Sequence, residues 1–385
     1  MGKAVITQFE VKVKPEDIAD LRSRLARTRW ADWLPGAGWG YGVDEAYIKR
    51  LCSYWQDGYD FAGYEARLNA WPQYLGELDG ERIQFYHVRS KVPSARPLVL
   101  VHGWPGSVVE FLDLIGPLSD PEAYGGNAED AFHVVVPSLP GYGYSGPTKN
   151  QGVNVLTAGA LIDGVMAALG YDRYFAQGGD WGSITTSRMA ETYPDRVAAL
   201  HVNMAPGGPA NPFLPVDGLS PAEEMELQAL RQFMMGDSAY AQIQSTRPQT
   251  LAVAMNDSPA GLAAWIVDKF HAWTDHGGDL SSAFDFDHLL DNLTLYWLTG
   301  TAGSSFRLYH ENNFRTAYRH AKVTVPTGVA RWAGEPFRWP RSLVEATYTN
   351  VKDWREFPGG GHFAAFQRKD DFLGAVRGFF RTQNL

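Results

Sequence analysis

Cysteine is nearly absent from this chain of 385 residues, in which Cys52 is the single one. An internal disulfide bond is therefore excluded, and so is a zinc site built on several cysteines. The sequence also lacks any apolar run of about 18 residues, the length that a transmembrane helix needs. The N-terminal residues form no apolar signal segment, and Ile6 stands where a myristoylation signal has Ser or Thr. We therefore expect a soluble, cytoplasmic protein without a membrane anchor.

Basic charge is also in short supply. The chain has 34 Lys and Arg against 43 Asp and Glu, for a net charge of −9. This balance argues against nucleic acid or an anionic membrane as a partner. Aromatic residues, in contrast, are plentiful, with 13 Trp and 20 Phe. Most must belong to the core, but their number also suggests aromatic walls around a binding pocket.

The segment 177–183 reads QGGDWGS, with an apolar stretch before it and a helical pattern after it. A strand that turns sharply into a helix, with small residues two positions either side of a central one, is the nucleophile elbow of an α/β-hydrolase. Gly178 and Gly182 flank the central position, which is Asp180. An aspartate in the place of the nucleophilic serine excludes a serine esterase. A carboxylate nucleophile attacks an sp³ carbon or a strained ring and forms an ester. The alternative is a glycine-rich turn with a surface aspartate.

The rest of the chain alternates between apolar runs and helical patterns, which predicts a mostly parallel sheet. A hairpin over 74–88 turns at Asp79-Gly80, and buried strands are expected at 97–101, 132–136 and 198–204. We predict an α/β-hydrolase fold whose sheet resumes with strands at 323–330 and 351–357. Its expected parts are a helical N-terminal meander packed on the core (1–75), a first core part (76–204), a helical lid (205–322) and a second core part (323–385).

Active residues of such sheets follow the carboxyl ends of strands. His362 follows three glycines after the last expected strand, and Glu335 lies in the loop after the strand before it. Nucleophile, acid and histidine then occur in the order typical of this fold. Asp353 is a competing acid, but it falls within a strand. The backbone N–H groups of Trp104 and Trp181 would form an oxyanion hole. Against these roles, most of the 10 histidines must be structural, and 102–105 could be a plain turn.

Three motifs together resemble the α/β-hydrolase-fold epoxide hydrolases of the microsomal type: HGWPGS at 102–107, GGDWGS at 178–183 and GGHFAAF at 360–366. Lid segments at 256–259 and 297–301 and the N-terminal meander extend the resemblance over nearly the whole chain. Microsomal members carry an N-terminal membrane anchor, whereas this sequence starts in the meander. It therefore looks like a soluble bacterial relative, similar to the epoxide hydrolases of natural-product pathways such as enediyne biosynthesis.

The resemblance implies hydrolysis of a small-molecule epoxide to a vicinal diol through an ester on Asp180, without a metal or organic cofactor. It implies that Tyr240 and Tyr309 of the lid hold the epoxide oxygen, and it places the acid at Glu335, 27 positions before His362. We expect a bulky apolar or aromatic epoxide, because six aromatic residues near the elbow or in the lid are candidates for the pocket wall: Trp104, Trp181, Phe213, Trp265, Trp273 and Trp297.

Two other functions stay open on the sequence alone. Haloalkane dehalogenases share the aspartate elbow, the histidine and a tryptophan after the aspartate, but they bind halide with N–H donors in place of the lid tyrosines. A non-catalytic protein could instead keep the fold as a ligand pocket, although it would have no need of the catalytic set. An exposed aromatic face on the N-terminal segment would also allow a homodimer.

Overall fold

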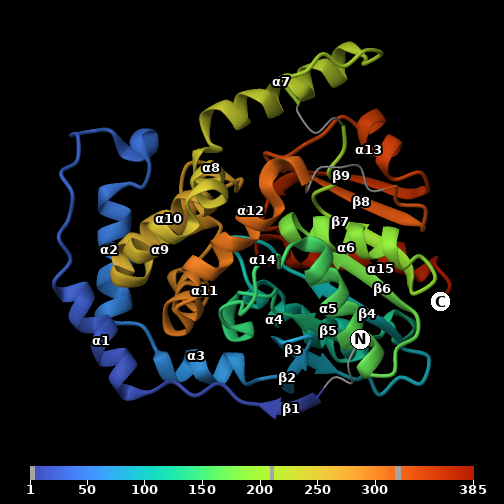
Figure 1. Ribbon diagram of the computed structural model, residues 1–385, viewed down its shortest axis with the longest axis horizontal. Coiled ribbons are helices and arrows are strands. Elements are labelled where there is room, and N and C mark those ends of the chain that lie inside the picture. The colour runs from blue at the N-terminus through green and yellow to red at the C-terminus, as the bar shows by residue number, and fades with distance from the viewer. Residues whose placement is uncertain (1–4, 209–211, 317–321) are drawn as a thin grey trace.

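The computed structural model describes residues 5–208, 212–316 and 322–385. In these ranges nine strands form one sheet (Figure 1). The first three neighbouring pairs in the sheet order are antiparallel and the remaining ones are parallel. In sheet order the strands are β1 (Val5–Phe9), β2 (Gln73–Leu78), β3 (Glu81–Val88), β5 (Phe132–Pro137), β4 (Arg96–Val101), β6 (Tyr174–Gly178), β7 (Val197–Val202), β8 (Thr327–Gly334) and β9 (Val351–Gly361).

Helices cover both faces of the sheet. Helices α5 (Val155–Ala168) and α6 (Asp180–Thr192) pack together over one face, and α4 (Leu112–Ser119) and α15 (Lys369–Arg381) pack together over the other (Figure 1). The central strands are consequently enclosed on both sides, and every residue of β6 and β7 is buried. This accounts for their mostly apolar sequence, since a strand covered on both faces needs no polar alternation.

The predicted α/β-hydrolase fold is confirmed, with three local corrections. The N-terminal region, expected to be helical, also contains β1, which pairs with β2 at the sheet edge. The strand expected at 323–330 is β8, which begins only at Thr327, and Val323 makes an isolated bridge to Tyr348. The glycines at 359–361 belong to β9 itself and do not follow it.

Six lid helices follow β7: α7 (Pro221–Gly236), α8 (Ala239–Thr246), α9 (Pro248–Asp257), α10 (Pro259–Ala272), α11 (Phe286–Thr299) and α12 (Ala302–Thr316). Helix α7 begins with a capping box formed by Ser220 and Glu223 and extends away from the other lid helices (Figure 1). The N-terminal meander contains α1 (Pro15–Ala26), α2 (Glu45–Asp57) and α3 (Phe61–Leu68) and lies along the lid. Among the described helices, none is long and apolar enough to cross a membrane.

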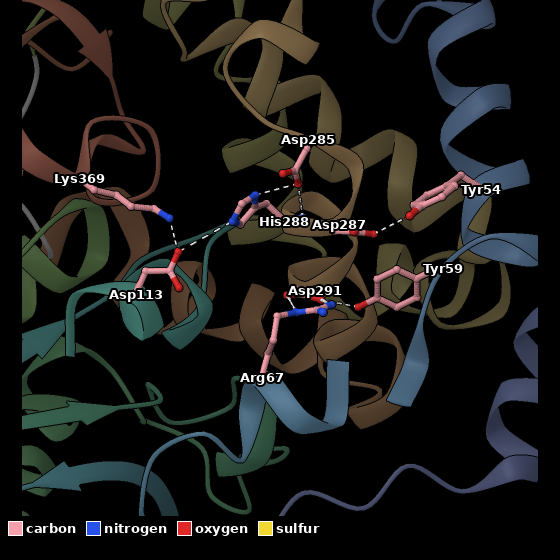
Figure 2. Close-up of polar contacts among 9 residues, drawn as sticks. All are labelled: Tyr54, Tyr59, Arg67, Asp113, Asp285, Asp287, His288, Asp291 and Lys369. Atoms are coloured by element: carbon pink, nitrogen blue, oxygen red, sulfur yellow. Dashed lines mark hydrogen bonds and ion pairs between the residues drawn. The ribbon is translucent and has the colours of Figure 1, made fainter. Parts of the chain in front are cut away.

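Helix α11 of the lid makes polar contacts on two sides (Figure 2). Toward the core, His288 faces Asp113 of α4, which also pairs with Lys369 of α15. Toward the meander, Asp291 accepts hydrogen bonds from Arg67 of α3 and from the hydroxyl of Tyr59. The lid is therefore attached to both the core and the meander through the same helix.

Candidate active site

Asp180 lies at the sharp turn between β6 and α6. Its backbone has a φ of 51°, in the left-handed region that residues with a side chain rarely adopt. The turn brings α6 against β4 so closely that a Cβ atom on Gly182 would lie 1.9 Å from the carbonyl oxygen of Val101. Only glycine fits at position 182, and it allows the strained turn. The turn presents the Asp180 carboxylate at the carboxyl end of the strands.

The loop after β4 supplies a hydrogen-bond donor to this carboxylate. The backbone N–H of Trp104 donates to Oδ1 of Asp180 over 2.8 Å. His102 supports the loop: its Nε2 accepts from the N–H of Leu139, and its Nδ1 lies 3.0 Å from the carbonyl oxygen of Gly103. Burial lowers the pKa of His102 to about 4, so this histidine is neutral and structural. Trp181 lies in the first turn of α6, where backbone N–H groups have no partner within the helix.

The acid and the histidine follow the last two strands of the sheet, β8 and β9. Glu335 directly follows β8 and His362 directly follows β9, as expected from the sequence. Nδ1 of His362 lies 2.9 Å from Oε2 and 3.1 Å from Oε1 of Glu335, and its Nε2 lies 3.4 Å from Oδ2 of Asp180. Asp353, the competing acid, pairs with Arg355 on β9 instead.

Nε2 of His362 has no hydrogen-bond partner within the part of the chain that the structure describes. The ring is nevertheless fixed, because Glu335 holds Nδ1 and the N–H of Phe337 holds Oε1 of Glu335. Both side chains of the His362–Glu335 pair are 3% exposed, so solvent does not compete for this contact. The arrangement presents one free imidazole nitrogen beside the Asp180 carboxylate, where it can accept a proton from water.

Two lid tyrosines face Asp180 from above. Tyr240 on α8 and Tyr309 on α12 line one cavity together with Asp180, and their ring centroids are 6.0 Å apart. The hydroxyl of Tyr309 is buried and, among the described residues, has no hydrogen-bond partner. Burial raises the pKa of Tyr309 well above its ordinary value, so the phenol keeps its proton and remains a donor.

The cavity wall is mostly apolar. Besides Asp180, Tyr240 and Tyr309 it is lined by Trp181, Ile184, Met204, Met234, Ser238, Ala241 and Phe337. Sequence reasoning missed most of these residues, because single methionine, isoleucine and alanine residues in the core or the lid have no distinctive pattern. Only Phe337 could have been suspected from the sequence, because it lies two positions after the predicted acid Glu335.

The structure brings three of the six predicted wall aromatics close to the site. Trp181 lines the cavity, Trp104 stacks on Tyr240 with 5.1 Å between ring centroids, and Trp273 packs against His362 at 5.0 Å. Three other candidates lie elsewhere: Phe213 is 48% exposed, Trp265 donates to Gln244 between lid helices, and Trp297 faces Arg24 of the meander. None of the three is among the residues that line the cavity beside Asp180.

Comparisons with known proteins agree with this geometry. The family model "Epoxide hydrolase N terminus" matches residues 6–111, and the "alpha/beta hydrolase fold" model matches residues 96–250. A protein of Stigmatella aurantiaca is 44% identical over 98% of this chain and 85% of its own length. Epoxide hydrolase 1 of Oryctolagus cuniculus is 36% identical over 95% of this chain and 86% of its own.

A solved structure extends the agreement to three dimensions. The juvenile hormone epoxide hydrolase of the silkworm Bombyx mori superposes with a TM-score of 0.87 at 32% identity, covering 98% of this chain and 95% of that one. The match includes the meander, the sheet and the lid, since it spans almost all of both chains. The chain therefore belongs to the epoxide hydrolases of the α/β-hydrolase fold.

Proposed function

We propose that this epoxide hydrolase converts an apolar or aromatic epoxide to a vicinal diol in two steps, through an ester on Asp180. The observation that carries the proposal is the meeting of Asp180, His362 and the two lid tyrosines around one apolar cavity. In the first step the Asp180 carboxylate attacks a ring carbon and the epoxide C–O bond breaks. Charge builds on the departing oxygen, where hydrogen bonds from Tyr240 and Tyr309 strengthen in the transition state.

In the second step water hydrolyses the ester. His362 accepts a proton from water at Nε2 while Glu335 holds the opposite ring nitrogen and stabilises the imidazolium. The resulting hydroxide attacks the carboxyl carbon of Asp180. The Trp104 N–H, which already donates to Oδ1, stabilises the oxyanion together with the N–H of Trp181. When the ester C–O bond breaks, the leaving oxygen takes the proton from the imidazolium. The acid proton left on Asp180 passes to the epoxide-derived oxygen, so that the diol is neutral and the Asp180 carboxylate is restored.

The substrate class follows from the cavity wall. Apart from Asp180, its lining residues carry no charge at neutral pH, and their polar side-chain groups are the two tyrosine hydroxyls, the Ser238 hydroxyl and the indole N–H of Trp181. An apolar substituent on the epoxide would replace water against Ile184, Met204 and Phe337. Met204 and Met234 are flexible and can adapt to substituents of different shape.

A single turnover with styrene oxide in ¹⁸O-labelled water tests the covalent mechanism. We expect the label in the peptide that contains Asp180 and an unlabelled oxygen in the diol. Label in the diol alone would mean direct attack by water and would overturn the assignment of Asp180. Chloride release from a chloroalkane under the same conditions would favour dehalogenase chemistry instead.

A further inference from the structure

A second, smaller cavity adjoins Asp180. Its walls come only from the core: the loop after β4, the 3₁₀ helix Val108–Phe111, Gly179, Asn203 and the segment after β9. The lid tyrosines do not line it, whereas Asp180 and His362 do. Its volume is about 10 Å³, which is of the order that holds one water molecule. The site thus has a lid-side cavity for an apolar substrate and a core-side cavity with polar walls.

Glu110 places a second carboxyl group in this core-side cavity. Its Oε1 lies over the loop after β4, where a Cβ atom on Gly106 would come within 1.6 Å of it. Any side chain at position 106 would displace the carboxyl group. Glu110 lines the cavity and keeps a partly accessible surface.

The charge state of Glu110 follows from its surroundings. Burial raises its pKa to about 8, and the nearby Asp180 carboxylate acts in the same direction, while His362 and a backbone contact at Ser107 oppose the shift. Near neutral pH most Glu110 side chains therefore carry a proton. A neutral carboxyl group in this position does not repel the Asp180 carboxylate, and its carbonyl oxygen can accept a hydrogen bond.

Two of the other side chains in the lining have their acceptor atoms engaged. Both ring nitrogens of His102 contact the backbone, and the amide oxygen of Asn203 accepts from Gln177. Once Asp180 is esterified, Nε2 of His362 and the carboxyl group of Glu110 are the side-chain acceptors of this lining that can hold a water molecule. A water bound by both would have its two hydrogens fixed and one lone pair free.

We propose that Glu110 is a further catalytic residue that binds the hydrolytic water in the core-side cavity; the proposal rests on the ester mechanism above. One water hydrogen points to Nε2 of His362 and the other to Glu110. The oxygen lone pair then forms the new bond to the carboxyl carbon of the Asp180 ester. The first hydrogen moves to His362 as a proton, and the second stays on the oxygen that Asp180 acquires. The ester C–O bond breaks, and the alkoxide leaves with the proton from His362.

Single-turnover kinetics of Glu110→Leu and Glu110→Gln test this role. Rapid quenching with styrene oxide, followed by mass spectrometry of the Asp180 peptide, measures ester formation and ester hydrolysis separately. We expect Glu110→Leu to form the ester at close to the wild-type rate and to hydrolyse it about 100-fold more slowly, so that the ester accumulates. Glu110→Gln keeps an amide oxygen as acceptor and should show a smaller loss in the same step.

Glu81→Gln is the matched control. Glu81 is also a buried glutamate, but it accepts hydrogen bonds from the backbone of Lys149 and Asn150, away from Asp180. This variant should be less stable yet keep the wild-type ratio of the two rates. Equal slowing of both steps in the Glu110 variants, or hydrolysis at the wild-type rate, would overturn the role of Glu110.

The dependence of ester hydrolysis on pH provides a further readout. The titratable groups facing Glu110 are His362, Asp180 and Tyr296. In Glu110→Gln the wild-type profile should lose one titration and keep that of His362, and an unchanged profile would contradict the proposal. If the wild-type enzyme forms no ester at all, the covalent mechanism itself fails. A wild-type ester that the Glu110→Leu variant hydrolyses normally refutes only the inference about Glu110.

Discussion

His362 experiences two carboxylates at once. Burial lowers its pKa, but the charges of Glu335 and Asp180 and the hydrogen bond to Glu335 outweigh that effect and raise the pKa well above its ordinary value. Below that pKa the imidazole is protonated and cannot act as a base. In the proposed mechanism the formation of the ester removes the Asp180 charge, so the pKa of His362 falls when a base is required. The nucleophile would thereby control the base that follows it.

This coupling predicts that Asp180→Asn lowers the pKa of His362. The substitution keeps the shape of the side chain and removes one of the two charges that favour the imidazolium. Titration of the histidine rings by NMR measures the shift, with His288 as an internal control, since it faces Asp113 and Asp285 and not Asp180. A His362 pKa that is the same in both proteins would mean that Asp180 does not govern its protonation.

At the level of single residues, the sequence was informative where chemistry requires a pattern. Asp180, Glu335 and His362 each follow a strand, and the structure brings them together. Glu110 escaped notice because a glutamate in the first turn of a helix usually faces solvent. Its burial depends on a glycine four positions earlier and on the residues after β9, which no local pattern connects. The catalytic roles of Asp180, Glu335, His362 and Glu110 remain predictions.

Among the elements, helix α11 stands out because it joins the lid to the meander. Asp291 is 5% exposed and accepts three hydrogen bonds, from Nε and Nη2 of Arg67 and from Tyr59. One turn earlier, Asp287 accepts a hydrogen bond from Tyr54 at the exposed end of the same interface (Figure 2). Both aspartates accept a hydrogen bond from a tyrosine of the meander, but Asp291 is buried and Asp287 is exposed to solvent.

We expect Asp291→Asn to destabilise the protein by about 1–3 kcal/mol, because the substitution removes the negative charge of the pair and leaves the Arg67 charge without its partner. The range allows for solvent screening of the pair, because the Arg67 side chain is 41% exposed. Asp287→Asn should cost less than ~1 kcal/mol. Urea unfolding of both variants measures the difference. Equal losses would indicate that burial does not determine the strength of these contacts.

The elements that the sequence did not predict correctly lie where tertiary contacts decide. Strand β1 is short and its residues are mostly exposed, so it lacks the alternation of a half-buried strand, and its pairing with β2 defines it. The positions of the lid aromatics could not be read from the sequence for a related reason. A helical period shows that a helix has an apolar face, but only packing decides whether that face meets the cavity, another lid helix or the meander.

For the whole molecule, the meander acts as an outer layer of the lid. Trp55 is fully buried and donates to Thr294 on α11 over 2.9 Å. Trp39 stacks on His271 with 3.9 Å between ring centroids, and Tyr47 packs edge-on against Phe286. These contacts join segments more than 200 positions apart in the sequence. Meander and lid thus bury each other's apolar faces.

A chain that begins at residue 70 should therefore fail to fold as a stable monomer. It would expose the surfaces of α10 and α11 that now face α1 and α2, and it would leave β2 as an unprotected edge strand. Size-exclusion chromatography and circular dichroism of the truncated and full-length chains test this expectation. We expect aggregates or loss of a cooperative thermal transition in the truncated chain. A monodisperse, cooperatively unfolding product would show that sheet and lid form a self-sufficient unit, with the meander only attached to its surface.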